Sequence, residues 1–171
     1  MHTLLPMNAI EQDFESGAAR TAVLRGMVGG AVATAGMSAV MFAAQRTGLL
    51  GRMPPRKITH AALDALGVRR SKDQEYGLTG LAHLGYGIGC GALFGWLEPR
   101  TRARHLPASL RGAAFASLIW AVSYAGWVPA LGIMEWPRND RPGRPTSMLV
   151  AHWVFGSILG ALVGRRRESR P

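Results

Sequence analysis

Two histidines are the residues of this sequence most able to do chemistry in an apolar setting. His83 stands near the start of AHLGYGIGCGALFG (82–95), and His152 near the start of AHWVFGSILGALVG (151–164). Both stretches fit A-H-x-x-[YF]-G-x-x-x-G-A-L-x-G, and neither contains Asp, Glu, Lys or Arg. A polar ionisable side chain in such a stretch is a candidate for function. An imidazole can relay a proton, ligate haem iron or bind zinc.

The candidate polar or ligand site consists of His83, His152, Glu135 and Tyr86. Glu135 follows the third apolar stretch, at the end where both histidines enter, and would be the proton acceptor or the mouth of a path. Zinc is a weak alternative, because no ligands follow one another at sequence-local spacing. The structural interpretation is that each imidazole bonds to a neighbouring helix backbone or to Tyr86. We expect no metal and no cofactor, with bis-histidine haem as the alternative.

Four stretches without Asp, Glu, Lys or Arg must position these side chains. Each is 19 to 23 residues long and can cross a hydrocarbon core of about 30 Å as a helix. The predicted fold is an all-α integral membrane protein, one membrane domain over residues 1–171. Its transmembrane helices are expected at about 22–45, 77–97, 110–134 and 146–164, with an interfacial helix at about 55–68. Residues 1–21 are expected as a polar lead-in.

The chain carries an internal repeat of two helices. LRG (24–26) opens the first predicted span and LRG (110–112) opens the third, while the AH-led stretches form the second and fourth. Two units of two spans keep the same orientation across the bilayer. We therefore predict two tandem two-helix repeats around a pseudo-twofold axis along the membrane normal.

Small residues define the predicted packing faces. Residues four apart share one side of a helix, and glycines there let helix backbones approach closely in lipid. Small residues are expected inside the four-helix bundle, and Leu, Val, Phe and Met outside. If the two ladders face each other, His83 and His152 meet at one depth. Pro129 should loosen the helix just before it, near Gly126. The predicted packing glycines form two ladders: Gly87, Gly91 and Gly95, then Gly156, Gly160 and Gly164.

The formal net charge of +10 does not indicate a nucleic-acid partner. The basic residues lie beside and between the apolar stretches, where membrane proteins keep them against lipid headgroups. Ten fall on each side of the predicted membrane, so the charge count sets no orientation. The arginines within 100–104 and 165–167 lie close to helix ends and favour cytoplasmic termini. The expected partners are the bilayer and a second copy or a larger membrane complex.

The segments AHLGYG, WVPALGI and AHWVFG, with the LRG-led first helix, resemble the YagU-like family of bacterial inner-membrane proteins of unknown function. The resemblance covers roughly residues 22 to 164. It implies a bacterial inner-membrane protein with four spans, and it implies no reaction, cofactor or site.

We expect a structural, envelope-homeostasis or complex-subunit protein of the inner membrane, and not an enzyme. Ser117, Ser123 and Ser157 lie in apolar helix without a partnered base and acid. One alternative is a small channel or proton-coupled carrier that uses the paired histidines. A second alternative is a haem-binding redox subunit.

Overall fold

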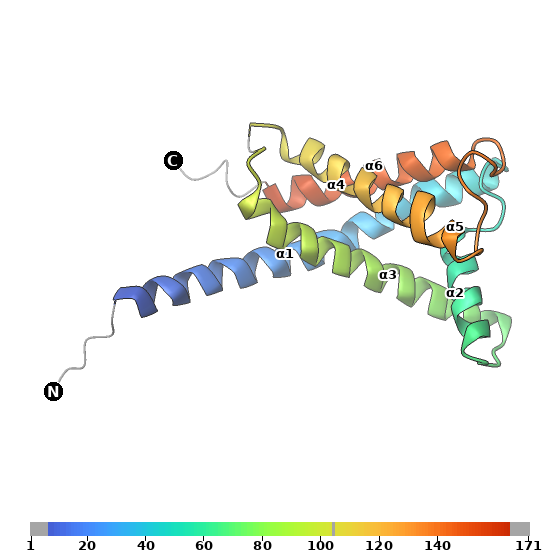
Figure 1. The fold of residues 1–171 in the computed structure, drawn as a ribbon, viewed down its shortest axis with the longest axis horizontal. Coiled ribbons are helices and arrows are strands. Elements are labelled where there is room, and N and C mark those ends of the chain that lie inside the picture. The colour runs from blue at the N-terminus through green and yellow to red at the C-terminus, as the bar shows by residue number, and fades with distance from the viewer. Residues whose placement is uncertain (1–6, 104, 165–171) are drawn as a thin grey trace.

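The computed structural model describes residues 7–103 and 105–164, and its regular structure there is entirely helical (Figure 1). A 3₁₀ turn (Glu98–Arg100) follows α3, and a π-helical segment (Ser123–Trp127) joins α4 to α5. The expected all-α class is confirmed, whereas the arginines at 104 and 165–167 lie outside the described residues. The α-helices are α1 (Met7–Arg46), α2 (Pro54–Ala65), α3 (Lys72–Leu97), α4 (Ala108–Val122), α5 (Val128–Ala130) and α6 (Arg144–Gly164).

Helix ends follow local sequence chemistry. The Ser71 side chain accepts from the Gln74 backbone N–H, and the Gln74 side chain accepts from the Ser71 N–H, so α3 begins with a capping box. At the end of α5, Gly132 takes φ +70° and its N–H donates to Pro129 O at 2.9 Å. The helix predicted to reach residue 134 therefore ends at Ala130.

The first helix is longer than the sequence pattern predicts. α1 contains 40 residues, about 60 Å at 1.5 Å per residue, against a hydrocarbon core of about 30 Å. No proline interrupts it, so the helix continues through residues expected as a separate lead-in. Figure 1 shows its N-terminal part projecting beyond the other helices.

The loosening predicted before Pro129 is confirmed. Residues Ser123–Trp127 form a π-helical segment in which Gly126 has φ −126° and ψ −107°. Proline supplies no N–H, so the preceding turn loses a helical hydrogen bond and widens. The Ser123 hydroxyl donates to Ile119 O at 2.6 Å and satisfies one carbonyl there. Ser123 and Trp127 both line the space between the long helices.

The long helices pack in the order α3, α1, α6, α4, with α1 against α3 and α6, and α4 against α6. Neighbouring members of each pair run in opposite directions in Figure 1. A Cβ atom added at Gly91 would overlap the carbonyl oxygen of Gly26 on α1. A Cβ added at Gly156 would likewise overlap the carbonyl oxygen of Gly112 on α4.

The two glycine ladders do not face each other, so the condition under which the histidines were expected to meet is not fulfilled. Gly87, Gly91 and Gly95 face α1, while Gly156, Gly160 and Gly164 face α4. Close approach needs small residues on both partners, and α1 and α4 supply them in Gly26, Gly30, Ala108 and Gly112. Each ladder is covered by the helix that precedes it in its own half of the chain.

The interior differs from the expected small-inside arrangement. Met37, Met41 and Met148 are 7%, 1% and 5% exposed, so these methionines lie inside, contrary to the prediction. An unbranched thioether fills irregular gaps between helices. Outward-facing apolar side chains follow α1 at Leu24, Val28 and Val32.

Within the described residues, three helices are long and apolar enough to span a membrane: Gly17–Arg46, Ala108–Ala130 and Arg144–Gly164. α3 is not among them, because its many glycines and polar His83 and Tyr86 contribute little hydropathy. Its length alone, 26 residues, would suffice for a span.

A buried polar cluster holds the loop between α5 and α6. Arg144 is 7% exposed; its Nε donates to Leu50 O at 2.9 Å and its Nη1 donates to Asp140 Oδ1 at 2.5 Å. The Tyr124 hydroxyl donates to Asp140 Oδ2 at 2.6 Å. The cluster ties this loop to the π-helical segment, to α6 and to the end of α1.

The glycine contacts predict an asymmetric response to alanine. Gly91→Ala forces a methyl group onto backbone atoms that cannot rotate away, and should lower the free energy of unfolding by about 1–3 kcal/mol. Gly89→Ala on the same helix meets nothing within 4 Å and should cause no loss. Unfolding titrations in detergent compare the two variants. Equal stability of both would contradict the close approach of α1 and α3.

The Arg144 cluster predicts a second difference. Asp140→Ala leaves the buried guanidinium of Arg144 without its carboxylate and should cost about 3–5 kcal/mol of the unfolding free energy. Asp64→Ala removes a carboxylate whose side chain is 54% exposed and should cost no more than about 1 kcal/mol. The same titrations measure both, and a mild Asp140→Ala would show that the cluster is not a structural clamp.

Candidate functional site

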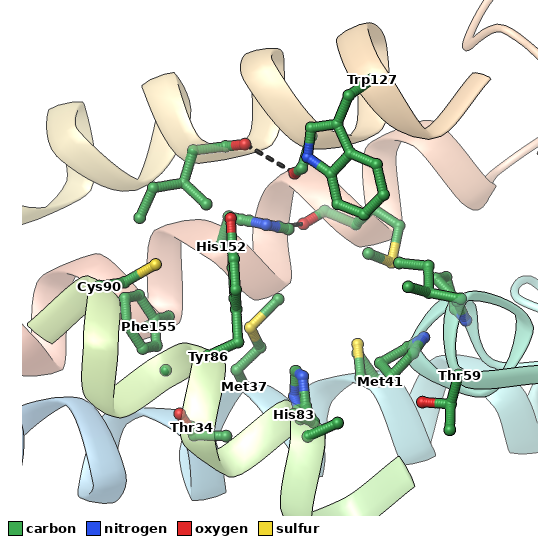
Figure 2. A pocket seen from close by; sticks show the side chains of 18 residues that line it. Thr34, Met37, Met41, Thr59, His83, Tyr86, Cys90, Trp127, His152 and Phe155 are labelled. Carbon is green, nitrogen blue, oxygen red and sulfur yellow. Dashed lines mark hydrogen bonds between the residues drawn. The ribbon is translucent and has the colours of Figure 1, made fainter. Parts of the chain in front are cut away.

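A cavity of about 270 Å³ lies between the long helices and is bounded at one end by α2. Both histidines line it, His83 from α3 and His152 from α6 (Figure 2). The rest of the lining is largely apolar, with Met41 from α1 and Phe155 from α6 among it. The histidines thus line one cavity even though their glycine ladders face different helices.

His152 has a defined hydrogen-bonding state. Its side chain is buried, at 6% exposure, and its Nδ1 lies 2.7 Å from the carbonyl oxygen of Met148 on the preceding turn. A carbonyl only accepts, so Nδ1 carries the hydrogen and donates. In the neutral ring, Nε2 is then left with a lone pair and acts as an acceptor. The partner is the residue's own helix, not the neighbouring helix or the tyrosine that the sequence suggested.

His83 presents an unsatisfied polar atom. Its Nε2 is buried and has no hydrogen-bond partner among the described residues. Such an atom costs free energy in the folded state, and its presence calls for an explanation such as a ligand or water. The unpartnered nitrogen belongs to a residue of the cavity wall.

The structure places the other two predicted site residues, Tyr86 and Glu135, differently. Tyr86 lines the cavity and is 52% exposed, so it lies at the edge. Glu135 is exposed in the segment after α5 and does not belong to the lining. The helix ends early, at Ala130, so Glu135 lies in the segment that follows it and not at the helix end.

The sequence did not predict several of the residues that line the cavity. The thioethers of Met37, Met41 and Met148 all reach the cavity wall. A signal existed: Met37 and Met41 are four apart, and Met148 precedes His152 by four, so each pair shares a helix face. Pro54 and Ile58 of α2 also line the cavity, which the sequence pattern alone could not place.

The cavity has a mouth at one side. Ala82 and Tyr86 on α3 are exposed, and Trp127 at the end of the π-helical segment is 38% exposed. All three line the cavity, and Figure 2 shows Tyr86 and Trp127 projecting from different helices. The opening therefore lies between α3 and the α4–α5 helix. Farther along, the rings of Phe94 and Phe115 join α3 to α4, with centroids 5.2 Å apart.

An ionic contact holds α2 over the end of the cavity. Arg56 Nε donates to Glu75 Oε1 at 2.8 Å, and the guanidinium lies 4.1 Å from the centroid of the Tyr76 ring. Glu75 Oε2 also lies 3.1 Å from His60 Nδ1. The Arg56 hydrogen bond holds the pKa of Glu75 below its usual range. α2 is thus tied to the start of α3 by charge.

The helices and the cavity define an α-helical protein with helices of membrane-spanning length and a largely apolar pocket that opens at one side. Residues 20–171 match the model of a family of unknown function, DUF6789, and the chain belongs to that family. No curated protein and no solved structure matched the chain. The resemblance to YagU-like proteins stays a prediction.

The lowered pKa of Glu75 predicts an acid-sensitive contact between α2 and α3. A depressed folded-state pKa contributes stability above the unfolded pKa, about 4.3, which is lost as pH falls through the folded value. Spin labels at Ala62 and Leu81, with Cys90 replaced by Ala, should give a narrow distance distribution at neutral pH. That distribution should broaden in acid, as the pH falls below the unfolded pKa of a glutamate side chain.

Two variants test the assignment. Glu75→Gln should broaden the distribution at neutral pH as well, because the carboxylate is absent. His60→Gln removes the imidazole that contacts Glu75 and should leave the acid transition in place. If the acid transition disappears in His60→Gln, the contact with His60 is responsible for it instead.

Proposed function

We propose that this chain is a small, non-enzymatic, multi-pass protein of the bacterial inner membrane that holds a lipid-soluble small molecule in its histidine-lined cavity. Such a protein would serve as a structural or envelope-homeostasis factor, or as a subunit of a larger membrane complex. The observation that carries the proposal is the apolar cavity of about 270 Å³ with its mouth between α3 and the α4–α5 helix.

Four spans arranged as two units form part of this proposal. α3 packs along α1, whose segment Gly17–Arg46 is long and apolar enough to cross a membrane, so α3 would share its depth. The uncharged part of α3 covers 77–97. The contacts of Gly91 on Gly26 and of Gly156 on Gly112 support the repeat with its pseudo-twofold axis. The cytoplasmic placement of the termini rests on the basic residues beside the helix ends.

The mouth would face the acyl chains in this arrangement. A gap between two spanning helices opens sideways into the bilayer, whereas α2 covers the end that points toward the membrane surface. Molecules that partition into lipid would therefore reach the cavity without crossing an aqueous entrance. The bilayer is the first partner of the protein, and a second copy or a larger complex would form through the remaining lipid-facing surface. No nucleic acid is involved.

The transport alternative has less support. On α3 the lining extends to Cys90 and on α6 to Phe155, and one turn beyond Cys90 the Phe94 and Phe115 rings meet. Close contact of Gly91 and Gly95 with α1 leaves no space on that side. A continuous path from one membrane face to the other is therefore not favoured.

The haem alternative also has less support. The glycines that could have seated a porphyrin are covered by the backbone of α1 and α4. The cavity volume of about 270 Å³ lies just below the range of about 300–1,000 Å³ for pockets of drug-sized ligands. The space suits one substituted ring better than a macrocycle.

A small apolar photolabel tests the proposal. The protein is reconstituted in lipid nanodiscs and irradiated with a trifluoromethyl phenyl diazirine, and labelled peptides are mapped. Labelling of cavity residues such as Met41 and Cys90 should saturate with concentration, because a cavity holds a limited number of molecules. Labelling of lipid-facing Leu118, which is 61% exposed, should increase without saturation.

A filled cavity provides the control. Ser123→Leu places a larger apolar side chain in the lining and should abolish the saturable labelling, while Leu118→Phe on the lipid-facing side should preserve it. Non-saturable labelling of the cavity residues in the unmodified protein would contradict ligand binding there.

A further inference from the structure

We infer that the cavity selects a lipid whose ring head carries a hydroxyl group, as in phenol- or quinol-type lipids. This inference rests on the proposed function and specifies its ligand. It follows from two imidazole nitrogens, from the size of the cavity, and from the side chains around it.

The hydrogen-bonding states of the two histidines call for a group that both donates and accepts. Because Nδ1 of His152 donates to Met148 O, its Nε2 accepts, and a ligand atom beside it must carry a hydrogen. The buried Nε2 of His83, a residue of the same lining, has no partner among the described residues, and in the tautomer that carries the hydrogen on Nε2 it would donate to a ligand oxygen. A hydroxyl group offers both a donor and an acceptor.

Ligands without a donor fit less well. A ketone, an ether or an oxidised quinone presents only oxygen lone pairs, which would face the lone pair of His152 Nε2. A pure hydrocarbon would offer neither nitrogen a hydrogen-bond partner, and the Nε2 of His83 is buried, where an unmade hydrogen bond is costly. Water could satisfy them in the empty state, and a ring hydroxyl replaces its hydrogen bonds on entry.

Size and lining favour a ring. An apolar cavity of about 150 Å³ in another protein binds benzene, so about 270 Å³ accommodates a ring with several substituents. The thioethers of Met37, Met41 and Met148 surround the space, and sulfur–aromatic contacts are favourable. An alkyl tail on the ring would leave through the mouth beside Tyr86 and Trp127 into the bilayer.

A matched pair of ligands tests the inference. 4-Decylphenol and its methyl ether differ in the single hydrogen that His152 would accept, and decylbenzene lacks the oxygen. Each competes with the diazirine photolabel for the cavity of the unmodified protein in nanodiscs. The half-competing concentration of the phenol should be about tenfold lower than those of the ether and the hydrocarbon.

Variants assign the effect to the histidine. In His152→Phe the preference for the phenol should fall to about twofold or less. His105→Phe, at an exposed loop position, should keep the full preference. The comparison of phenol and ether in the unmodified protein requires no variant, so it stands even if His152→Phe fails to fold.

The outcomes separate the two proposals. Saturable labelling with equal competition by phenol and ether overturns the hydroxyl selectivity and leaves ligand binding in place. A preference that survives in His152→Phe also overturns the inference, because another group then recognises the hydroxyl. Labelling that never saturates overturns both proposals together.

Discussion

The contact of one helix backbone with another is the constraint on which the structure depends. Where α1 meets α3 and α4 meets α6, carbonyl oxygens occupy the positions that a Cβ atom would fill, so only glycine fits at the closest contacts. Each close pair then packs as a single unit, and the contact between α1 and α6 joins the two pairs. Because α3 and α4 lie at the outer positions of this row, a space remains between them. The cavity is a consequence of the tight packing elsewhere.

That space is apolar but contains polar atoms at a few positions. Its wall consists largely of methionine and aromatic side chains, and its polar groups are mostly satisfied within their own helices, as Ser123 is by Ile119 O. The two imidazoles differ from these other polar groups, because each imidazole retains a nitrogen that forms no hydrogen bond within its own helix. The charged contact between Arg56 and Glu75 keeps α2 over the end of this space, while the sideward opening stays free.

Helical periodicity predicted which faces carry the glycines, but not which helix covers them, because spacing along one helix contains no information about its neighbour. For the same reason the sequence placed both histidines on inner faces but suggested the wrong packing for their ladders. Glu135 was misplaced because the positive φ of Gly132 ends the helix early. The cluster of Arg144, Asp140 and Tyr124 joins separate segments of the chain, and no local sequence pattern predicts it.

The central claim is that the mouth of the cavity opens into lipid, and the environment of Trp127 tests it most directly. A variant that keeps Trp127 as its single tryptophan is compared with one that keeps only Trp136, which is 43% exposed in the loop after α5. Lipids brominated along the acyl chain should strongly quench Trp127 and should quench Trp136 weakly. Trp127 fluorescence that is quenched by aqueous acrylamide and not by brominated chains would contradict a lipid-facing mouth.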